Sequence, residues 1–349
     1  MMNGLLFVGC RTTKERGARG KGIKAFETNT TTPGVLKHLT SGLVNPSWLC
    51  LDEKKEFLYT IHGDMSDVSA FSINKINGGL TRINTVSTAG ENPVHISIDK
   101  TNRWVFVANL QTGTISVIPR NSDGSLGNLH KLYTIPGLTD GAISHPHQVF
   151  QDISRNYLVV PCQGRKYGFG QIVVFRINSV DGTLEETCTV RSRELAEPRH
   201  CVFHASNRYC YCVNEKDFTI TAYSFDETQG VLSPFQVIPT LPDTCTDDGW
   251  ASGIIMDQTS RFVIVSNRKQ NSISSLLVDP NTGRLTLIDT MGSFGEQPRF
   301  IYLLPNGLLL VANELTDSLE FFNLDDNGKF HHLNMQIKTE SPVSAVSWQ

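Results

Sequence analysis

The sequence predicts an all-β protein, a seven-bladed β-propeller whose ring is closed by the C-terminal strand pairing into the N-terminal blade. A turn signal recurs seven times along the 349 residues, and the same order of apolar segments surrounds each copy. Apolar and polar residues alternate with a period of two, and almost no stretch shows the period of an α-helix. Four short antiparallel strands repeated seven times are typical of a propeller.

The recurring turn signal is a Gly-x-Leu triplet. Its copies start at Gly34, Gly78, Gly124, Gly182, Gly230, Gly283 and, with phenylalanine in place of leucine, Gly328, at spacings of 44 to 58 residues. Asp, Asn, Thr or Gln often precedes the glycine, as a turn that needs a positive φ favours. Each copy therefore marks a hairpin between the last two strands of a blade.

The other strands of each repeat follow in a fixed order, which the third repeat illustrates. A turn leads into a first apolar strand, "NPVHISID" (92–99), and a strongly apolar second strand follows, "WVFVANL" (104–110). A third β-rich strand, "TISVIP" (114–119), precedes the glycine hairpin. The order predicts four antiparallel strands in every blade.

The two ends of the chain complete one blade between them. The first repeat begins at its second strand, "LLFVGC" (5–10), and the chain ends with "SPVSAVSW" (341–348), which fits the missing first strand. We expect this segment to be the innermost strand of the first blade, because the pairing covers edges that would otherwise be exposed. No linker interrupts the repeats, so residues 1–349 are expected to form a single propeller domain.

Composition limits the partners and the compartment. The chain is 39% hydrophobic and 19% charged, with a net charge of −3, which gives no reason to expect nucleic acid or an acidic membrane surface as a partner. It has no apolar run long enough to span a bilayer, and its N-terminus does not resemble a signal peptide. The eight cysteines form no CxxC pair, which favours free thiols. We expect a cytoplasmic monomer or weak homo-oligomer.

Unusual polar residues gather at two places in the repeats. The start of a first strand and the end of a second strand lie on the same face of an antiparallel blade, so these residues should surround the mouth of the central channel. First strands begin with His145, His147, Arg199, His200 and Arg299. Second strands end with Gln163, Arg165, Asn214, Glu215, Asn267, Arg268, Asn313 and Glu314.

Structural roles compete with functional ones at several of these positions. The three asparagines are equally good turn formers, and the arginines that follow prolines could link neighbouring blades. His145 lies on the loop side and is expected at the solvated rim. In "HPHQVFQD" (145–152), His147 shares one side with Val149 and Gln151, so we expect it to begin the strand and face the channel. A buried Glu215 would need the arginines of neighbouring blades as partners.

Several short motifs, in their order along the chain, carry a resemblance to a known family. They are "HPHQV" (145–149), "PRH" (198–200) with "VNE" (213–215), "VSNR" (265–268), and "PRF" (298–300) with "VANE" (311–314). Over the full ring the sequence resembles the lactonase-type propellers, which include bacterial 6-phosphogluconolactonases and fungal 3-carboxy-cis,cis-muconate lactonizing enzymes. The resemblance implies a catalytic cluster of His147, Arg199, Glu215 and Arg268.

Two positions depart from the family pattern. The second strand of the fourth blade ends in "PCQGRK" (161–166) rather than an Asp-Leu-Gly-type turn, and the sixth blade begins with Ala251-Ser252 rather than an Ala-Glu pair. Neutral or basic groups therefore replace two acidic ones, which leaves the substrate open.

The residue types at the mouth suit a small anionic substrate. Arg199, Arg268 and Arg299 can bind carboxylate or phosphate through paired hydrogen bonds, and we expect His145, His200, Gln163, Arg165 and Glu314 to contact the substrate as well. Lactone hydrolysis needs a base, which Glu215 or His147 could supply, and an arginine to stabilise the oxyanion. Cyclisation of an unsaturated di- or tricarboxylate needs the same groups, so both reactions stay open.

No metal or cofactor is expected, because the mouth lacks three clustered carboxylate or imidazole ligands. A non-catalytic scaffold or ligand-binding protein is the remaining alternative, since propellers host many functions. The mouth argues against it, because it is rich in Arg, His and Glu rather than in exposed aromatic residues.

Two loops should also lie near the mouth. Residues 12–22 link the second and third strands of the first blade, and their basic residues Lys14, Arg16, Arg19 and Lys21 either attract an anionic substrate or form a solvated loop. Residues 241–250 form a long polar entry to the sixth blade, which we expect over the channel.

Overall fold

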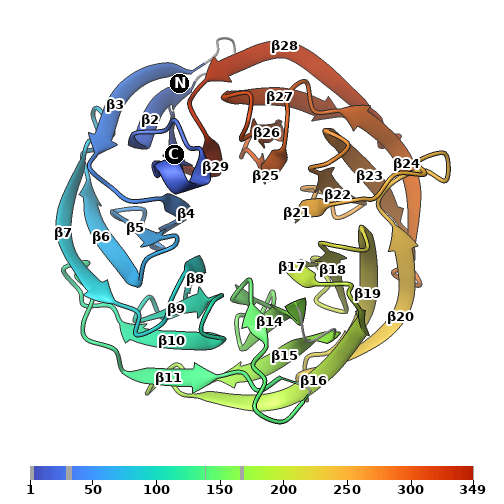
Figure 1. The fold of residues 1–349 in the computed structure, drawn as a ribbon, viewed down its shortest axis with the longest axis horizontal. Coiled ribbons are helices and arrows are strands. Elements are labelled where there is room, and N and C mark those ends of the chain that lie inside the picture. The colour runs from blue at the N-terminus through green and yellow to red at the C-terminus, as the bar shows by residue number, and fades with distance from the viewer. Residues whose placement is uncertain (1–3, 29–33, 138, 166–168, 349) are drawn as a thin grey trace.

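Seven sheets surround a central channel in the computed structural model, which describes residues 4–28, 34–137, 139–165 and 169–348 (Figure 1). Six of them have four strands, and the fourth has five because its inner strand is divided in two. The predicted all-β, seven-bladed propeller is confirmed. The structure includes a 3₁₀ turn, η1 (Lys14–Arg16), and no helix among the described residues could cross a membrane.

Each blade runs from an innermost strand at the channel to an outermost strand at the rim. The first three blades consist, in that order, of β29 (Pro342–Trp348), β1 (Gly4–Cys10), β2 (Gly22–Thr28) and β3 (Val35–Ser41); β4 (Pro46–Leu51), β5 (Phe57–His62), β6 (Asp67–Ile73) and β7 (Leu80–Ser87); β8 (Pro93–Ile98), β9 (Trp104–Asn109), β10 (Thr114–Pro119) and β11 (Lys131–Thr134).

The fourth blade has two short inner strands, and the last three blades are regular. They consist of β12 (His145–Pro146) and β13 (Phe150–Gln151), β14 (Tyr157–Gln163), β15 (Phe169–Ile177) and β16 (Leu184–Glu194); β17 (Pro198–Phe203), β18 (Tyr209–Asn214), β19 (Thr219–Asp226) and β20 (Val231–Pro239); β21 (Ala251–Met256), β22 (Phe262–Asn267), β23 (Ser272–Val278) and β24 (Leu285–Gly292); β25 (Pro298–Leu303), β26 (Leu309–Asn313), β27 (Ser318–Leu324) and β28 (Phe330–Lys338).

The C-terminal strand closes the ring as predicted. Strand β29 pairs antiparallel with β1, in a register that places Trp348 opposite Leu5 and Val346 opposite Phe7. It also contacts the second blade, because Ser344 Oγ accepts a hydrogen bond from the backbone N–H of Leu49 at 3.0 Å. The N-terminal strand β1 and the C-terminal strand β29 therefore lie side by side in the first blade.

The innermost strand of the fourth blade differs from the expected continuous strand over residues 145–152. It is interrupted between β12 and β13, although the backbone N–H of His147 still donates to Pro161 O at 2.9 Å. At the interruption the chain contacts its neighbours on both sides. The N–H of Val149 points at His95 Nδ1 of the third blade at 3.4 Å, and Gln148 Oε1 accepts from the N–H of Cys201 in the fifth blade at 2.6 Å. These contacts to other blades replace regular pairing.

The hydrophobic core lies between the blades. The buried apolar side chains of the described residues form seven clusters, one at each interface between neighbouring blades. Five glycines of the turn signal form part of these interfaces, and each sits against the aromatic residue that opens the second strand of the preceding blade. The pairs are Gly124 with Phe57, Gly182 with Trp104, Gly230 with Tyr157, Gly283 with Tyr209 and Gly328 with Phe262.

Replacing Gly230 by alanine is expected to lower the free energy of unfolding by about 2–4 kcal/mol. Gly230 has a φ of 73°, and a Cβ there would lie 2.2 Å from a ring carbon of Tyr157. Gly42 is a matched control, because its φ is 75° and nothing lies within 4 Å of its Cβ position. Urea denaturation should show that Gly42→Ala lowers the free energy of unfolding by only about 1 kcal/mol, which is the part of the loss that the positive φ alone causes. Equal losses in the two variants would mean that the blade contact is not tightly packed.

Candidate active site

A cavity of about 570 Å³ opens at the centre of the ring, on the face where first strands begin and second strands end. Side chains from all seven blades line it. Among the described lining residues are six arginines and four carboxylates, so the wall carries more positive than negative charge. The charged and imidazole residues are Arg11, Glu15, Arg16, Asp64, His147, Arg165, Arg199, His200, Glu215, Arg268, Arg299 and Glu314.

Glu215 is the centre of one charged cluster in this wall. It follows β18, and its Oε2 lies 3.0 Å from Arg199 Nε and 3.2 Å from Arg268 Nη2. Gln163 Nε2 donates to the same oxygen at 3.1 Å, and Trp250 Nε1 donates to Oε1 at 2.9 Å. Four side chains from three blades therefore fix the orientation of this carboxylate.

The arginines favour the ionised form of Glu215. Burial alone would raise the pKa of Glu215, but the charges of Arg268 and Arg199 outweigh burial and hold it well below its usual range. Burial in turn lowers the pKa of Arg268 to about 10. A carboxylate held in this state is a weak base, so its main effect is to orient and neutralise the arginines.

Both arginines of this cluster keep one terminal nitrogen for a ligand. Arg199 Nη1 donates to Ser252 O and Arg268 Nη2 to Ala251 O, each at 2.9 Å. Arg199 thereby links the fifth and sixth blades, as the structural alternative proposed. The structure shows no acceptor among the described residues for Arg199 Nη2 or Arg268 Nη1, and both side chains line the cavity although they are only 3% exposed. These two nitrogens can therefore donate into the cavity.

His147 lines the cavity and is 6% exposed. Its Nδ1 is buried and has no hydrogen-bond partner among the described residues, so proton exchange with a ligand in the cavity falls to Nε2. Burial lowers the pKa of His147 well below 6.5, and the charge of Arg199 adds to this effect. The imidazole is therefore neutral at neutral pH and can accept a proton.

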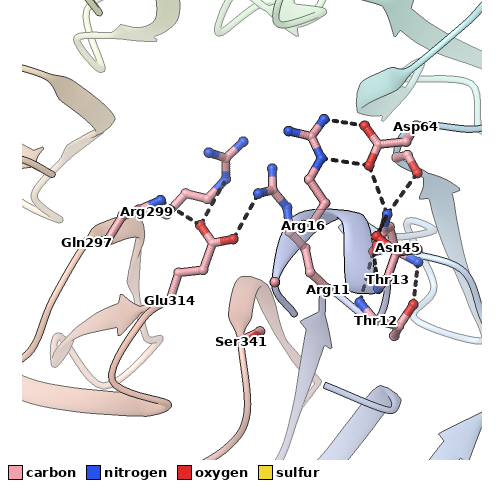
Figure 2. A network of polar contacts seen from close by, with 12 residues as sticks. Arg11, Thr12, Thr13, Arg16, Asn45, Asp64, Gln297, Arg299, Glu314 and Ser341 are labelled. Carbon is pink, nitrogen blue, oxygen red and sulfur yellow. Dashed lines mark hydrogen bonds and ion pairs between the residues drawn. The ribbon is translucent and has the colours of Figure 1, made fainter. Parts of the chain in front are cut away.

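Glu314 is the centre of a second charged cluster (Figure 2). Its Oε1 lies 2.9 Å from Arg11 Nη1, and its Oε2 lies 3.8 Å from Arg299 Nε and 3.2 Å from Gln297 Nε2, which donates to it. Arg11 follows β1 in the first blade, whereas the other three residues belong to the seventh blade. The cluster therefore bridges the first and seventh blades.

Arg16 lies beside this second cluster but has its own carboxylate. Its Nε donates to Asp64 Oδ2 at 2.8 Å, and its Nη2 donates to Oδ1 (Figure 2). Asn45 Nδ2 holds the same carboxylate at 2.9 Å, while Asn45 Oδ1 accepts from the backbone N–H of Thr12. These bonds attach the loop over residues 12–22 to the second blade.

Nine of the thirteen predicted mouth residues line this one cavity. His147, Arg199, Glu215 and Arg268 lie together, and the lining also includes His200, Gln163, Arg165, Arg299 and Glu314. His145 does not line the cavity, and its expected position at a solvated rim is wrong. It is 7% exposed, because its ring turns toward the third blade, where Nδ1 lies 2.8 Å from Leu110 O.

The strand-end asparagines act as turn formers. Asn214 Nδ2 donates to the hydroxyls of Thr219 and Thr221 at 2.9 and 3.0 Å, and Asn267 bonds Ser272 and Ser274 in the same way. Asn313 Nδ2 donates to Ser293 O at 2.9 Å. All three are buried and absent from the cavity wall, so the structural alternative explains them.

Sequence reasoning missed Arg11, Asp64 and Trp250 as individual site residues. Arg11 directly follows the second strand of the first blade, so the strand-end rule applied to that incomplete blade would have found it. Trp250 is the last residue of the loop expected over the channel, and it does line the cavity. Of the basic residues in the other loop, Arg16 pairs with Asp64 and Arg19 pairs with Asp317 at 2.7 Å.

Comparison with known proteins agrees with this architecture. A sequence profile described as "Lactonase, 7-bladed beta-propeller" matches residues 5–348. A 6-phosphogluconolactonase of Bacillus subtilis is 29% identical over 345 residues, covering 97% of each chain. One from Formosa agariphila is 26% identical over 354 residues, covering 95% of this chain and 96% of the other.

Solved structures share the fold over the whole chain. The periplasmic gluconolactonase PpgL of Pseudomonas aeruginosa superposes with a TM-score of 0.88 at 23% identity, covering 100% of this chain and 99% of the other. A protein from Lactobacillus plantarum superposes with a TM-score of 0.89 at 25% identity, covering all of both chains.

Proposed function

The chain belongs to the lactonase family of seven-bladed β-propellers, and from this membership we propose that it hydrolyses an anionic sugar-acid lactone, as a 6-phosphogluconolactonase does. The observation that carries the proposal is the placement of a neutral imidazole, His147, in one cavity with two arginines that have unused terminal nitrogens. Ester hydrolysis needs these two functions, a base for water and donors for the oxyanion.

The contacts of the two side chains favour His147 over Glu215 as the base, because four side chains contact the Glu215 oxygens whereas no described residue bonds His147 Nδ1. A base must be unprotonated and able to bind a proton, and the two arginines leave Glu215 with little tendency to bind one. His147 is unprotonated at neutral pH, and no described residue occupies its Nδ1. We therefore assign proton transfer to His147 Nε2, with Glu215 as the residue that positions Arg199 and Arg268.

The reaction then balances without any further reactant. A water molecule gives its proton to His147 Nε2 and its oxygen forms a bond to the lactone carbonyl carbon. Arg199 Nη2 and Arg268 Nη1 stabilise the negative charge that develops on the carbonyl oxygen. The ring C–O bond breaks as the tetrahedral intermediate collapses, and the alkoxide takes the proton back from the imidazolium. The product is the open-chain hydroxy acid.

The test is hydrolysis of 6-phosphogluconolactone and glucono-δ-lactone by the purified protein, measured above the spontaneous rate, with 3-carboxy-cis,cis-muconate as a third substrate. We expect lactone opening and no cyclisation. The value of kcat/KM should be constant across neutral pH down to 6.5, since His147 loses its function only as the pH falls through its lowered pKa.

A fall in kcat/KM with decreasing pH that is centred near pH 6.5 would exclude the buried His147 as the base. Turnover of the muconate alone would replace the lactonase assignment with a lactonizing one. Inactivity on all three substrates, together with a stable protein partner, would replace it with a scaffold role.

A further inference from the structure

The two charged clusters of the cavity differ in how fully their arginines are bonded. In the Glu215 cluster each arginine contacts the carboxylate and also donates to a backbone carbonyl. In the Glu314 cluster Arg299 contacts the carboxylate only through Nε, at 3.8 Å. No described residue accepts a hydrogen bond from either terminal nitrogen of Arg299, and these atoms extend beyond Glu314 in Figure 2.

Arg11 also has hydrogen-bond donors that no described residue accepts from. Its Nη1 bonds Glu314, whereas no described residue accepts from its Nη2 or Nε. The side chains of Arg11 and Arg299 are 14% and 19% exposed, so two partly buried guanidinium groups share one carboxylate. Burial lowers the pKa of Arg11 to about 9, and the neighbouring charge of Arg299 contributes to this shift. The wall therefore holds one uncompensated positive charge at this point.

An anion bound between Arg11 and Arg299 would satisfy the free donors and remove the repulsion. Guanidinium groups bind phosphate and carboxylate oxygens through paired hydrogen bonds, which a single buried carboxylate such as Glu314 cannot supply to both arginines. Glu314 and Gln297 hold the two side chains in place without covering their outer nitrogens. The arrangement therefore has the donors and the positive charge of an anion-binding site.

We propose that Arg11 and Arg299 form a subsite for a second anionic group of the substrate, a phosphate monoester or carboxylate remote from the lactone carbonyl. The proposal rests on the proposed function for the identity of the reacting end, at His147, Arg199 and Arg268. Both clusters line the same cavity of about 570 Å³, a volume within the range that holds a ligand the size of a sugar phosphate. Arg11 and Arg299 thus determine specificity, and they take no part in the bond-breaking step.

Arg16 offers the matched comparison. It lies on the same loop side of the same cavity, but Asp64 neutralises it through two hydrogen bonds, and Asn45 fixes that carboxylate. Arg16 keeps only Nη1 without a described acceptor, and Asp64 compensates its charge, so removing Arg16 deletes a paired positive charge rather than the uncompensated one between Arg11 and Arg299. A difference between Arg11 and Arg16 therefore separates a local subsite from general attraction by the charged mouth.

The experiment measures the preference for a phosphorylated substrate, defined as kcat/KM for 6-phosphogluconolactone divided by kcat/KM for glucono-δ-lactone. In Arg11→Met, which keeps an apolar stem but no charge, this ratio should fall about 30-fold or more. The fall should come from the KM for 6-phosphogluconolactone rather than from kcat. In Arg11→Lys, which keeps the charge but loses the paired donors of the guanidinium group, the ratio should fall by a smaller factor. Arg16→Met should retain the wild-type ratio.

A binding readout keeps the subsite testable apart from turnover. Isothermal titration of wild type should show tighter binding of 6-phosphogluconate than of gluconate, and Arg11→Met, with thermal melting as the folding check, should abolish the difference. If wild type opens the lactones but Arg11→Met and Arg16→Met lower the ratio equally, the subsite is wrong and the lactonase assignment stands. If no lactone is opened but the binding difference depends on Arg11, the subsite stands without the proposed reaction.

Discussion

Replacing His147 by alanine is expected to lower kcat for lactone opening by about 10²- to 10⁴-fold, the contribution typical of a positioned general base. The physical reason is the state of the imidazole, which is neutral, faces the cavity and has no described partner on Nδ1. Removing it leaves the arginines to stabilise the oxyanion but no group to accept the proton of water. Steady-state kinetics on 6-phosphogluconolactone should show the loss in kcat rather than in KM.

His145 is the control for this variant. It lies two residues earlier in the same blade, is similarly buried, and bonds Leu110 O instead of facing the cavity. His145→Ala should therefore reduce the melting temperature but leave kcat within about twofold, because lost buried hydrogen bonds affect folding rather than proton transfer. A larger loss of kcat in His145→Ala than in His147→Ala would reverse the roles assigned to the two imidazoles.

The ring and the position of the cavity could be read from the sequence because both follow from local rules. The glycine turns repeat, strands alternate, and antiparallel pairing places the start of a first strand beside the end of a second. This rule placed His147, Arg199, Glu215 and Arg268, which come from three blades, at the mouth of the channel. The family resemblance then singled out these four as the cluster.

Side-chain partners across blades could not be predicted in the same way. Arg11 and Glu314 lie 303 residues apart and meet only because the ring closes, and Arg16 is neutralised by a carboxylate of the next blade. The inner strand of the fourth blade breaks because Gln148 and Val149 bond to neighbouring blades, which no local pattern encodes. His145 was misplaced for the same reason, since its ring bonds to the third blade.

The structure shows what the residues at the two departures from the family pattern contact. Gln163, within the altered turn of the fourth blade, donates to Glu215 Oε2 at 3.1 Å. Ser252, at the start of the sixth blade, donates through Oγ to Arg299 O at 2.6 Å, and its own carbonyl accepts from Arg199. Neutral residues at these positions add no negative charge beside the arginines, so the cavity keeps its positive excess. This balance supports an anionic substrate.

Deleting residues 341–349 is expected to leave a protein that is insoluble or lacks a cooperative thermal transition. The deletion removes β29, the partner of β1, and exposes the edge of β1 together with buried apolar side chains of the first, second and seventh blades. It also removes the bond from Leu49 N–H to Ser344 and the bond from Trp348 Nε1 to Lys55 O at 2.6 Å. Because domains are stable by only about 5–15 kcal/mol, loss of a whole inner strand exceeds what the ring can absorb.

A circular permutant separates the role of this strand from that of chain length. Trp348 lies opposite Leu5, so a short linker can join the end of β29 to the start of β1 as a hairpin, with new termini between residues 340 and 341. This permutant keeps every strand and should melt cooperatively, as followed by circular dichroism. If the truncated protein is soluble and melts cooperatively, the first blade is stable with three strands. In that case β29 does not contribute the stability that closes the ring.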